Sequence, residues 1–135
     1  MWSATASITT TASPQAVWRL FEDVAGWPTW NAGIERIELF GRFATGSTFS
    51  MQPPGMEAFT STLIDVRANV GFTDETVIDG TRFVVSHELA PLPEGGTRIT
   101  YATQVTGPAA GELGPVVTAD FPDVLAALKA RAECP

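Results

Sequence analysis

The sequence predicts an α+β domain in which a curved, seven-stranded antiparallel sheet wraps around a long C-terminal helix, with two short helices after the first strand. One observation behind this prediction is an apolar stripe with helical spacing near the end of the chain. Its members are Phe121, Val124, Leu125 and Leu128. A second observation is that most of residues 2–105 alternate between apolar and polar side chains, with the period of two typical of strands. Such a sheet has one face toward the helix and one toward water.

Length and charge limit the class of protein. A chain of 135 residues suits a single domain, residues 1–135, that buries a core without metals or disulfides. The formal net charge of −7 argues against nucleic acid and anionic membrane surfaces as partners, because both attract clustered Lys and Arg. No apolar run reaches the about 18 residues of a membrane span, so we expect no membrane insertion. The chain has no heptad repeat, and we expect a monomer or a weak homodimer.

Cysteine and histidine usage bears on the compartment and on metal binding. Cys134 is the single cysteine and cannot form an internal disulfide, which favours a reducing, cytoplasmic location. The N-terminal residues show no basic residue followed by an apolar run. One histidine and one cysteine cannot supply the usual nitrogen and sulfur ligands of a metal site. Since no glycine-rich nucleotide loop occurs either, we expect no metal and no cofactor.

The N-terminal part is predicted to form one strand and two short helices. Residues 2–10 alternate and are rich in β-branched side chains. Ser13 and Pro14 are a strong helix start, because serine caps a helix and proline fits its first turn. The apolar positions of this helix are Val17, Leu20, Phe21 and Val24. Residues 27–31 predict a second short helix, since Pro28 again sits where a first turn tolerates it.

The rest of the chain is predicted to form strands followed by the long helix. About six strands cover residues 34–40, 48–52, 57–67, 70–78, 81–89 and 97–105. Apolar positions change parity within residues 57–67, as they do around a β-bulge. Asp79 and Gly80 are a tight-turn dipeptide between two of these strands. Residues 109–133 are predicted to be helical, with a kink or restart at Pro122, which has no amide hydrogen.

Four stretches carry a resemblance to a known family. They are residues 13–18 (SPQAVW), 27–31 (WPTWN), 95–101 (GGTRITY) and 106–108 (TGP). In this order they resemble the polyketide cyclase/dehydrase family of the START-like (SRPBCC) superfamily, which also contains birch-pollen-allergen-like proteins. The resemblance covers nearly the whole chain and implies the helix-grip fold. It also implies a cavity between the curved sheet and the last helix, because members of that superfamily bind hydrophobic ligands, cyclise polyketides or carry lipids, while others bind chaperones.

Strand parity and the implied cavity select a set of candidate ligand-binding residues. The predicted inner wall consists of Phe49, Met51, Phe59, Phe83, Val85, Ile99, and the polar side chains His87 and Tyr101. Three further candidates, which the resemblance places at the pocket mouth, are Trp27, Trp30 and Asn31. Ordinary core packing explains the apolar members equally well, so both interpretations stay open. A charge-rich stretch predicts a solvated strand face and loop; its members are Asp65, Arg67, Asp74 and Glu75.

Three functional hypotheses follow from these residues. The leading one is binding of a small hydrophobic, aromatic or polyketide-like ligand in the cavity. The second is a polyketide cyclase or dehydratase, in which His87 acts as general base and Tyr101 orients a carbonyl group. His87 is the only histidine, and histidine alone has an unperturbed side-chain pKa near neutrality. A histidine of the core wall is the simpler interpretation. The third is a protein-interaction module, which needs an exposed apolar patch.

Overall fold

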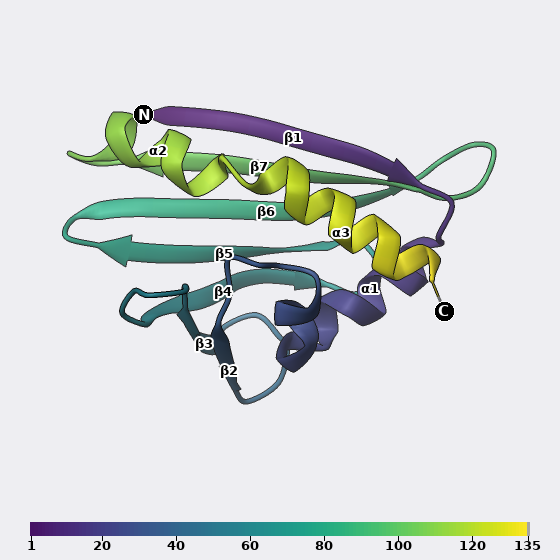
Figure 1. Cartoon of the computed structure of the whole chain (residues 1–135), viewed down its shortest axis with the longest axis horizontal. Coiled ribbons are helices and arrows are strands. Elements are labelled where there is room, and N and C mark those ends of the chain that lie inside the picture. The colour runs from purple at the N-terminus through teal and green to yellow at the C-terminus, as the bar shows by residue number, and fades with distance from the viewer. Residues whose placement is uncertain (135) are drawn as a thin grey trace.

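A seven-stranded antiparallel sheet in the order β1-β7-β6-β5-β4-β3-β2 forms the body of the protein (Figure 1). The structure is a computed structural model that describes residues 1–134. The strands are β1 (Trp2–Thr10), β2 (Arg36–Phe40), β3 (Thr48–Gln52), β4 (Phe59–Arg67), β5 (Gly71–Ile78), β6 (Thr81–Pro91) and β7 (Thr97–Thr106). The predicted seven-stranded sheet is therefore confirmed.

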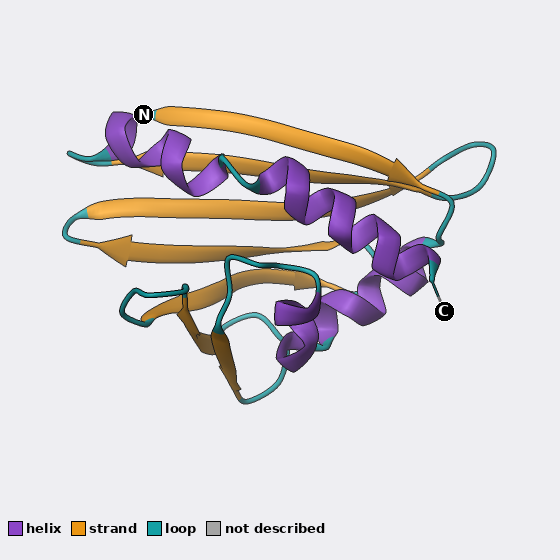
Figure 2. Cartoon of the chain, in the orientation of Figure 1, coloured by secondary structure: helices purple, strands orange, loops and turns teal. Residues whose placement is uncertain are grey.

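Helices cover the inner face of this sheet (Figure 2). They are α1 (Pro14–Glu22), the 3-10 helix η1 (Val24–Thr29), α2 (Ala110–Thr118) and α3 (Phe121–Glu133). The helices α2 and α3 run diagonally across the sheet, where α3 packs on β1 and α2 packs on β1 and β7 (Figure 1). The short helices α1 and η1 lie at one end, where α1 contacts α3 and η1 contacts β2. This arrangement confirms the predicted helix-grip fold.

The C-terminal helix is broken where the sequence predicts a restart. Helix α2 ends at Thr118 and α3 begins at Phe121, with Pro122 in the first turn of α3. Proline is tolerated there, because amides of the first turn have no partner within the helix. The predicted stripe is buried at Val124, Leu125 and Leu128. The long helix thus bends across the sheet instead of leaving it.

The first two helices follow from local signals. The Ser13 hydroxyl accepts a hydrogen bond from the Ala16 amide at 3.1 Å and caps α1 as predicted. The second helix is a 3-10 helix that begins at Val24, three residues earlier than predicted. Its position is fixed by the Trp27 indole, which donates a hydrogen bond to the Phe21 carbonyl at 2.9 Å in the last turn of α1. That tertiary contact is invisible in a local pattern.

The sheet curves through a bulge and tight turns. The register between β4 and β5 shifts between Leu63 and Asp65, which confirms the bulge predicted from the parity change. Asp79 and Gly80 adopt φ angles of 50° and 79° in the predicted turn between β5 and β6. A bulge bends its strand and increases the local twist, so it contributes to the curvature of the sheet at β4.

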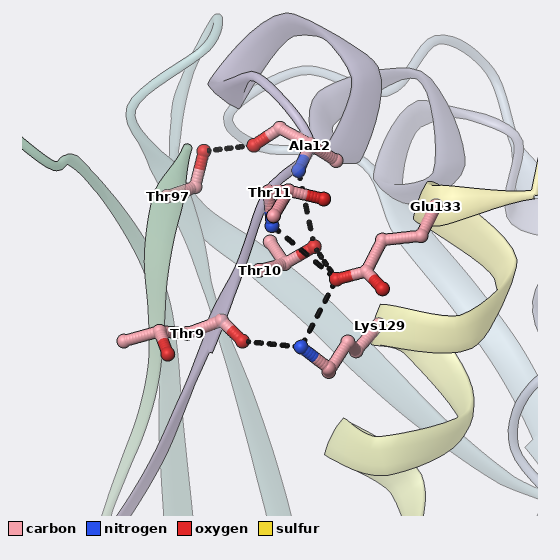
Figure 3. A network of polar contacts seen from close by, with 7 residues as sticks. All are labelled: Thr9, Thr10, Thr11, Ala12, Thr97, Lys129 and Glu133. Atoms are coloured by element: carbon pink, nitrogen blue, oxygen red, sulfur yellow. Dashed lines mark hydrogen bonds and ion pairs between the residues drawn. The ribbon is translucent and has the colours of Figure 1, made fainter. Parts of the chain in front are cut away.

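A polar clamp fastens the end of α3 to the end of β1 (Figure 3). The Thr10 hydroxyl donates to Glu133 Oε2 at 2.6 Å, and the Lys129 ammonium contacts the same oxygen at 3.0 Å. Lys129 also donates to the Thr9 carbonyl at 3.0 Å. Since Thr10 and Glu133 are 123 positions apart, this clamp joins the first strand to the last helix.

Replacing Glu133 with glutamine is expected to lower the melting temperature, because the carboxylate loses its ion pair with Lys129 and its charge-assisted bond from Thr10. The hydrogen bond from Thr10, followed by that from Lys129, lowers the pKa of Glu133. The clamp therefore contributes stability above the unfolded-state pKa and loses it as pH falls through the folded-state value. Thermal melts at pH 7 and pH 3 test this, with exposed Glu112→Gln in α2 as the control. Equal melting temperatures for both variants at pH 7 would contradict it.

Candidate functional site

Strand register places polar side chains side by side on the inner face. Two neighbouring rows cross β5, β6 and β7; they consist of Asp74, Val85 and Thr103, and of Phe72, His87 and Tyr101. The second row lies in the main core cluster, which includes α1 and α3 side chains, and the first is its neighbour toward the β5–β6 turn. The candidate site is therefore a polar group embedded in an otherwise apolar face.

His87 is fixed within a stack of aromatic rings. Its ring lies parallel to Phe72 at a centroid distance of 4.0 Å and edge-on to Tyr101 at 4.5 Å. The ring nitrogen Nδ1 lies 3.2 Å from the Phe72 carbonyl oxygen, and a carbonyl can only accept, so Nδ1 carries the proton. Burial lowers the pKa of His87 to about 3, against a smaller opposing effect of that hydrogen bond. His87 is thus neutral at pH 7, with the Nε2 lone pair available as an acceptor.

Asp74 is the site residue that the sequence analysis missed. Its side chain is only 16% exposed, and Oδ2 lies 4.0 Å from His87 Nε2, beyond hydrogen-bond distance. It has no hydrogen-bond partner among the residues that the structure describes. Burial raises the pKa of Asp74 to about 7. The prediction of a solvated face is therefore wrong for Asp74, although Asp65 and Arg67 in the same stretch are exposed and paired with each other.

Two hydroxyl groups complete the site. Tyr101 is 3% exposed, and its ring packs edge-on against Phe121 of α3 at 5.4 Å. Burial raises the pKa of Tyr101, and the negative charges of Asp74 and Asp120 raise it further. Thr103 is 1% exposed, and its Oγ1 is buried with no partner in the described chain. Thr103 therefore presents unused hydrogen-bonding capacity to the interior.

A comparison with known protein families shows the family of this chain. The model described as "Polyketide cyclase / dehydrase and lipid transport" matches residues 1–133. The chain belongs to this polyketide cyclase/dehydrase family. That membership confirms the resemblance seen in the sequence motifs. Among curated proteins no relative matches the chain.

Solved structures share the fold of this family member at low sequence identity. A protein from Mesorhizobium loti, MLL2253, has a TM-score of 0.82 and 14% identity, with 98% of this chain and 97% of that chain covered. Norcoclaurine synthase from Thalictrum flavum has a TM-score of 0.78 and 14% identity, covering 99% and 87%. The di-domain ARO/CYC StfQ from the steffimycin biosynthetic pathway has a TM-score of 0.78 and 16% identity, covering 97% and 50%. At these identities the likeness establishes the fold.

The predicted ligand-binding residues of this polyketide cyclase/dehydrase family member fall into two groups. The buried ones are Phe49, Phe83, His87, Ile99 and Tyr101. The partly exposed ones are Met51, Phe59 and Val85. Met51 and Phe59 lie on β3 and β4, and Val85 lies on β6 between the buried Phe83 and His87.

Of the three residues expected at the pocket mouth, the two tryptophans are buried and Asn31 is partly exposed. Trp27 and Trp30 are each 5% exposed and belong to the aromatic core. Trp27 stacks on Phe72 with the ring centroids 5.5 Å apart. The Asn31 side chain is used locally, because its Oδ1 accepts a hydrogen bond from the Gly33 amide at 2.9 Å. The two tryptophans therefore fill the end of the sheet that α1 and η1 close.

Two recesses on the described residues lie away from the polar group. One, of about 450 Å³, is bordered by η1, β2 and β3. The other, of about 250 Å³, lies across β4 to β7 and includes Asp65, Thr73 and Glu88 on the outer face. Neither lies between the sheet and α3. Figure 1 shows α2 and α3 over β1 and β7, while the parts of β5 and β6 near their connecting turn have no helix above them in this view.

Residues 1–134 contain no group of three or more side chains able to hold a metal ion. In the same part of the chain, no helix has the length and hydropathy needed to cross a membrane. The candidate site itself contains the Asp74 carboxyl, the His87 imidazole and the hydroxyls of Tyr101 and Thr103.

Replacing Thr103 with valine is expected to raise the free energy of unfolding by about 1 kcal/mol. The hydroxyl is buried without a partner, which costs about 1–3 kcal/mol, while valine has the same shape and no such group. Urea unfolding of both proteins measures the difference. The matched control is Thr100→Val, on the outer side of the same strand. A loss of stability in Thr103→Val would show that the hydroxyl has a partner.

Proposed function

We propose that this protein binds a small, largely apolar molecule with one or two polar atoms against the inner face, at Asp74, His87, Tyr101 and Thr103. The observation that carries the proposal is the buried Thr103 Oγ1 without a partner, in the same row as Asp74, whose Oδ2 lies 4.0 Å from His87 Nε2, inside an apolar face. Native proteins pair nearly all of their buried polar atoms, and an unpaired one is destabilising. A ligand that supplies the missing partners offsets that penalty.

The family and its structural neighbours support a small-molecule site. The family description names polyketide cyclase, dehydrase and lipid transport. The neighbour norcoclaurine synthase has been solved in complex with dopamine and hydroxybenzaldehyde, and StfQ is an aromatase/cyclase of a biosynthetic pathway. We infer the same general use of the fold for this chain. In our proposal the ligand reaches the polar group from the β5–β6 side, where Asp74 and Val85 are partly exposed.

Titration with 2-naphthol tests the proposal, because this probe combines an apolar body with one hydroxyl. Amide chemical shifts followed by NMR are expected to change for Asp74, Val85 and Thr103. Naphthalene, which has no hydroxyl, is expected to bind more weakly. Thr103→Val is expected to weaken 2-naphthol binding about 2- to 12-fold, the equivalent of one hydrogen bond of about 0.5–1.5 kcal/mol. Shift changes confined to the outer face would overturn the proposal, and Thr100→Val again serves as the control.

A second candidate function is proton transfer in a cyclase or dehydratase, and one observation favours it. A general acid or base works best when its pKa lies near the working pH, and burial raises the pKa of Asp74 to about 7. The pKa of His87, lowered to about 3, makes His87 a weak base. In this proposal Asp74 takes the role that the sequence analysis gave to His87, and Tyr101 holds the carbonyl oxygen.

Deuterium exchange at the carbon beside a ketone tests this candidate. In D₂O at pH 7, the protein is expected to speed exchange at the C–H groups next to the carbonyl of 2-tetralone, with Asp74 removing the proton. Asp74→Asn is expected to abolish the acceleration, whereas His87→Phe retains part of it. Acceleration that survives in Asp74→Asn would exclude this role.

The third hypothesis, an interaction module, has less support from the surface. The exposed large apolar side chains lie on several different elements; they include Phe40, Met56, Ile64, Val70, Val77, Ile78, Val116 and Val117. Single exposed apolar residues are usual for a soluble domain, whereas an interaction site requires a contiguous patch.

A further inference from the structure

The charged groups around the candidate site are of one sign. Asp74 lies on the inner side of β5, and Asp120 lies at the junction of α2 and α3, near enough to Tyr101 for its charge to act on that side chain. From β6 the site receives His87, which is neutral at pH 7, and from β7 it receives Tyr101, whose pKa is raised. The facing residue on β4, Leu63, is apolar. No group that is positively charged at pH 7 therefore opposes the two carboxyls within the described site.

The basic residues of the chain are all placed elsewhere. The chain has eight Lys and Arg residues. All seven arginines are exposed, and two of them, Arg67 and Arg82, pair with Asp65 and Glu75. The single lysine, Lys129, belongs to the clamp with Glu133. The Asp74 carboxyl thus lacks the cation that a buried carboxylate normally has.

The carboxyl groups of Asp74 and Asp120 both affect the hydroxyl group of Tyr101. Both negative charges contribute to the raised pKa of Tyr101, whose ring lies edge-on against the ring of Phe121, the residue that follows Asp120. Tyr101 is 3% exposed, and its ring lies edge-on to the His87 ring at 4.5 Å. Two carboxyls therefore lie close enough to the Tyr101 hydroxyl to act on it, beside the rings of Phe72, His87 and Phe121.

We propose that the ligand of this site carries a positive charge: an ammonium group on an aromatic or aliphatic body, paired with Asp74, with Asp120 at the entrance. This inference rests on the proposed small-molecule site and specifies its ligand class. An ammonium group supplies the missing counter-ion and up to three hydrogen-bond donors, which suit Asp74, the His87 Nε2 lone pair and the Tyr101 oxygen. The aromatic rings around the site favour a cation further. An anionic ligand such as a fatty acid is repelled.

Binding of an ammonium ion has a proton signature. A neighbouring positive charge favours the ionised form of Asp74, so binding lowers its pKa and releases a proton at pH values near 7. A neutral ligand of the same shape releases none. The proton count therefore separates a charge-paired complex from simple burial of an apolar body.

Three matched probes test the ligand class: phenethylamine, 2-phenylethanol and phenylacetate, which share a phenyl group and differ in charge. At pH 7.5, calorimetric titration is expected to show phenethylamine binding at least about tenfold more tightly than 2-phenylethanol, the effect of one charge-assisted hydrogen bond. Phenylacetate is expected to bind most weakly. Titrations in two buffers of different ionisation enthalpy are expected to show proton release for phenethylamine alone.

Variants test which residues cause the preference for phenethylamine over 2-phenylethanol. Asp74→Asn is expected to abolish both the preference for phenethylamine over 2-phenylethanol and the proton release. Asp120→Asn is expected to reduce the preference in part. The control is Glu75→Gln, because Glu75 is next to Asp74 in sequence but pairs with Arg82 on the opposite side of β5, and it is expected to change nothing.

The outcomes separate this inference from the proposed function. Equal affinities of unmodified protein for phenethylamine and 2-phenylethanol overturn the cation proposal, while the small-molecule site stands. Retention of the preference in Asp74→Asn also overturns it. If neither these probes nor 2-naphthol changes the amide shifts of the inner face, both proposals fail. The wild-type ranking decides the cation proposal even where a variant does not fold.

Discussion

Replacing Phe21 with alanine lowers the free energy of unfolding by about 3–5 kcal/mol, the range for a large aromatic side chain removed from a packed core. Phe21 is 0% exposed, and its ring meets Phe72 edge-on at 5.0 Å. Trp30 and His87 lie at 6.3 Å and 6.1 Å from the same ring. The cavity left by the substitution is closed on the sheet side by rigid rings that cannot relax into it. Urea unfolding at pH 7 measures the loss.

The control for this prediction is Phe40→Ala on β2. Phe40 is 48% exposed, so its removal is expected to change the free energy of unfolding by less than about 1 kcal/mol. The pair compares the same chemical change in the core and on the surface. Similar losses in the two variants would show that the aromatic core does not hold α1 against the sheet.

Local patterns in the sequence predicted the elements and their order, and the family resemblance added the helix-grip arrangement. Alternation placed seven strands, and the parity change within residues 57–67 predicted the bulge between Leu63 and Asp65. The Ser13 cap and the Pro122 restart depend on groups within one turn of each other in sequence. The second helix was displaced, because the Trp27 indole bonds to the last turn of the preceding helix rather than to its own segment. Signals that act over a few residues were thus reliable, and those that need a tertiary partner were not.

The site was only partly predictable for the same reason. Strand parity placed His87 and Tyr101 on the inner face, and the register confirms that they are direct neighbours. Strand parity also places Asp74 on the same side of β5 as Phe72. The charged residues next to Asp74 in the sequence nevertheless favoured the interpretation of a solvated strand face. A pKa depends on burial by strands distant in sequence, so neither the raised pKa of Asp74 nor the lowered pKa of His87 has a signal in the sequence. The residue roles proposed here therefore come from the assembled sheet.

Opposite pH dependences are expected for the stability of two variants, Asp74→Asn and His87→Phe. The pKa of Asp74 is raised from 3.8 to about 7, so between these values the native state holds a proton that the unfolded state has lost. The contribution of Asp74 to the free energy of unfolding is therefore complete below its unfolded-state pKa, and it is lost as pH rises through its folded-state pKa. The pKa of His87 is lowered from 6.5 to about 3, so the unfolded state holds the extra proton. Its contribution is full above 6.5 and is lost as pH falls toward 3.

The difference in free energy of unfolding between each variant and the wild type isolates the contribution of Asp74 or His87, because the titrations of all other groups cancel. The stability of Asp74→Asn relative to wild type is expected to rise by a few kcal/mol between about pH 4 and pH 7, at about 1.4 kcal/mol per unit of pKa shift and reduced by the 16% exposure of the side chain. The stability of His87→Phe relative to wild type is expected to fall by a similar amount between about pH 3 and pH 6.5. Urea unfolding at half-unit pH steps measures both.

The two slopes oppose each other between about pH 4 and pH 6.5, so the double variant is expected to differ from wild type by a nearly constant amount across that range. Any coupling of the two groups across the 4.0 Å between Oδ2 and Nε2 shows as a departure from the sum of the single variants. A flat difference for Asp74→Asn would place its carboxyl in water in the folded protein. Asp74 would then lose its suitability both as a proton-transfer group at neutral pH and as a buried anchor for a cation, and the inner face would bind its ligand through Tyr101 and Thr103 alone.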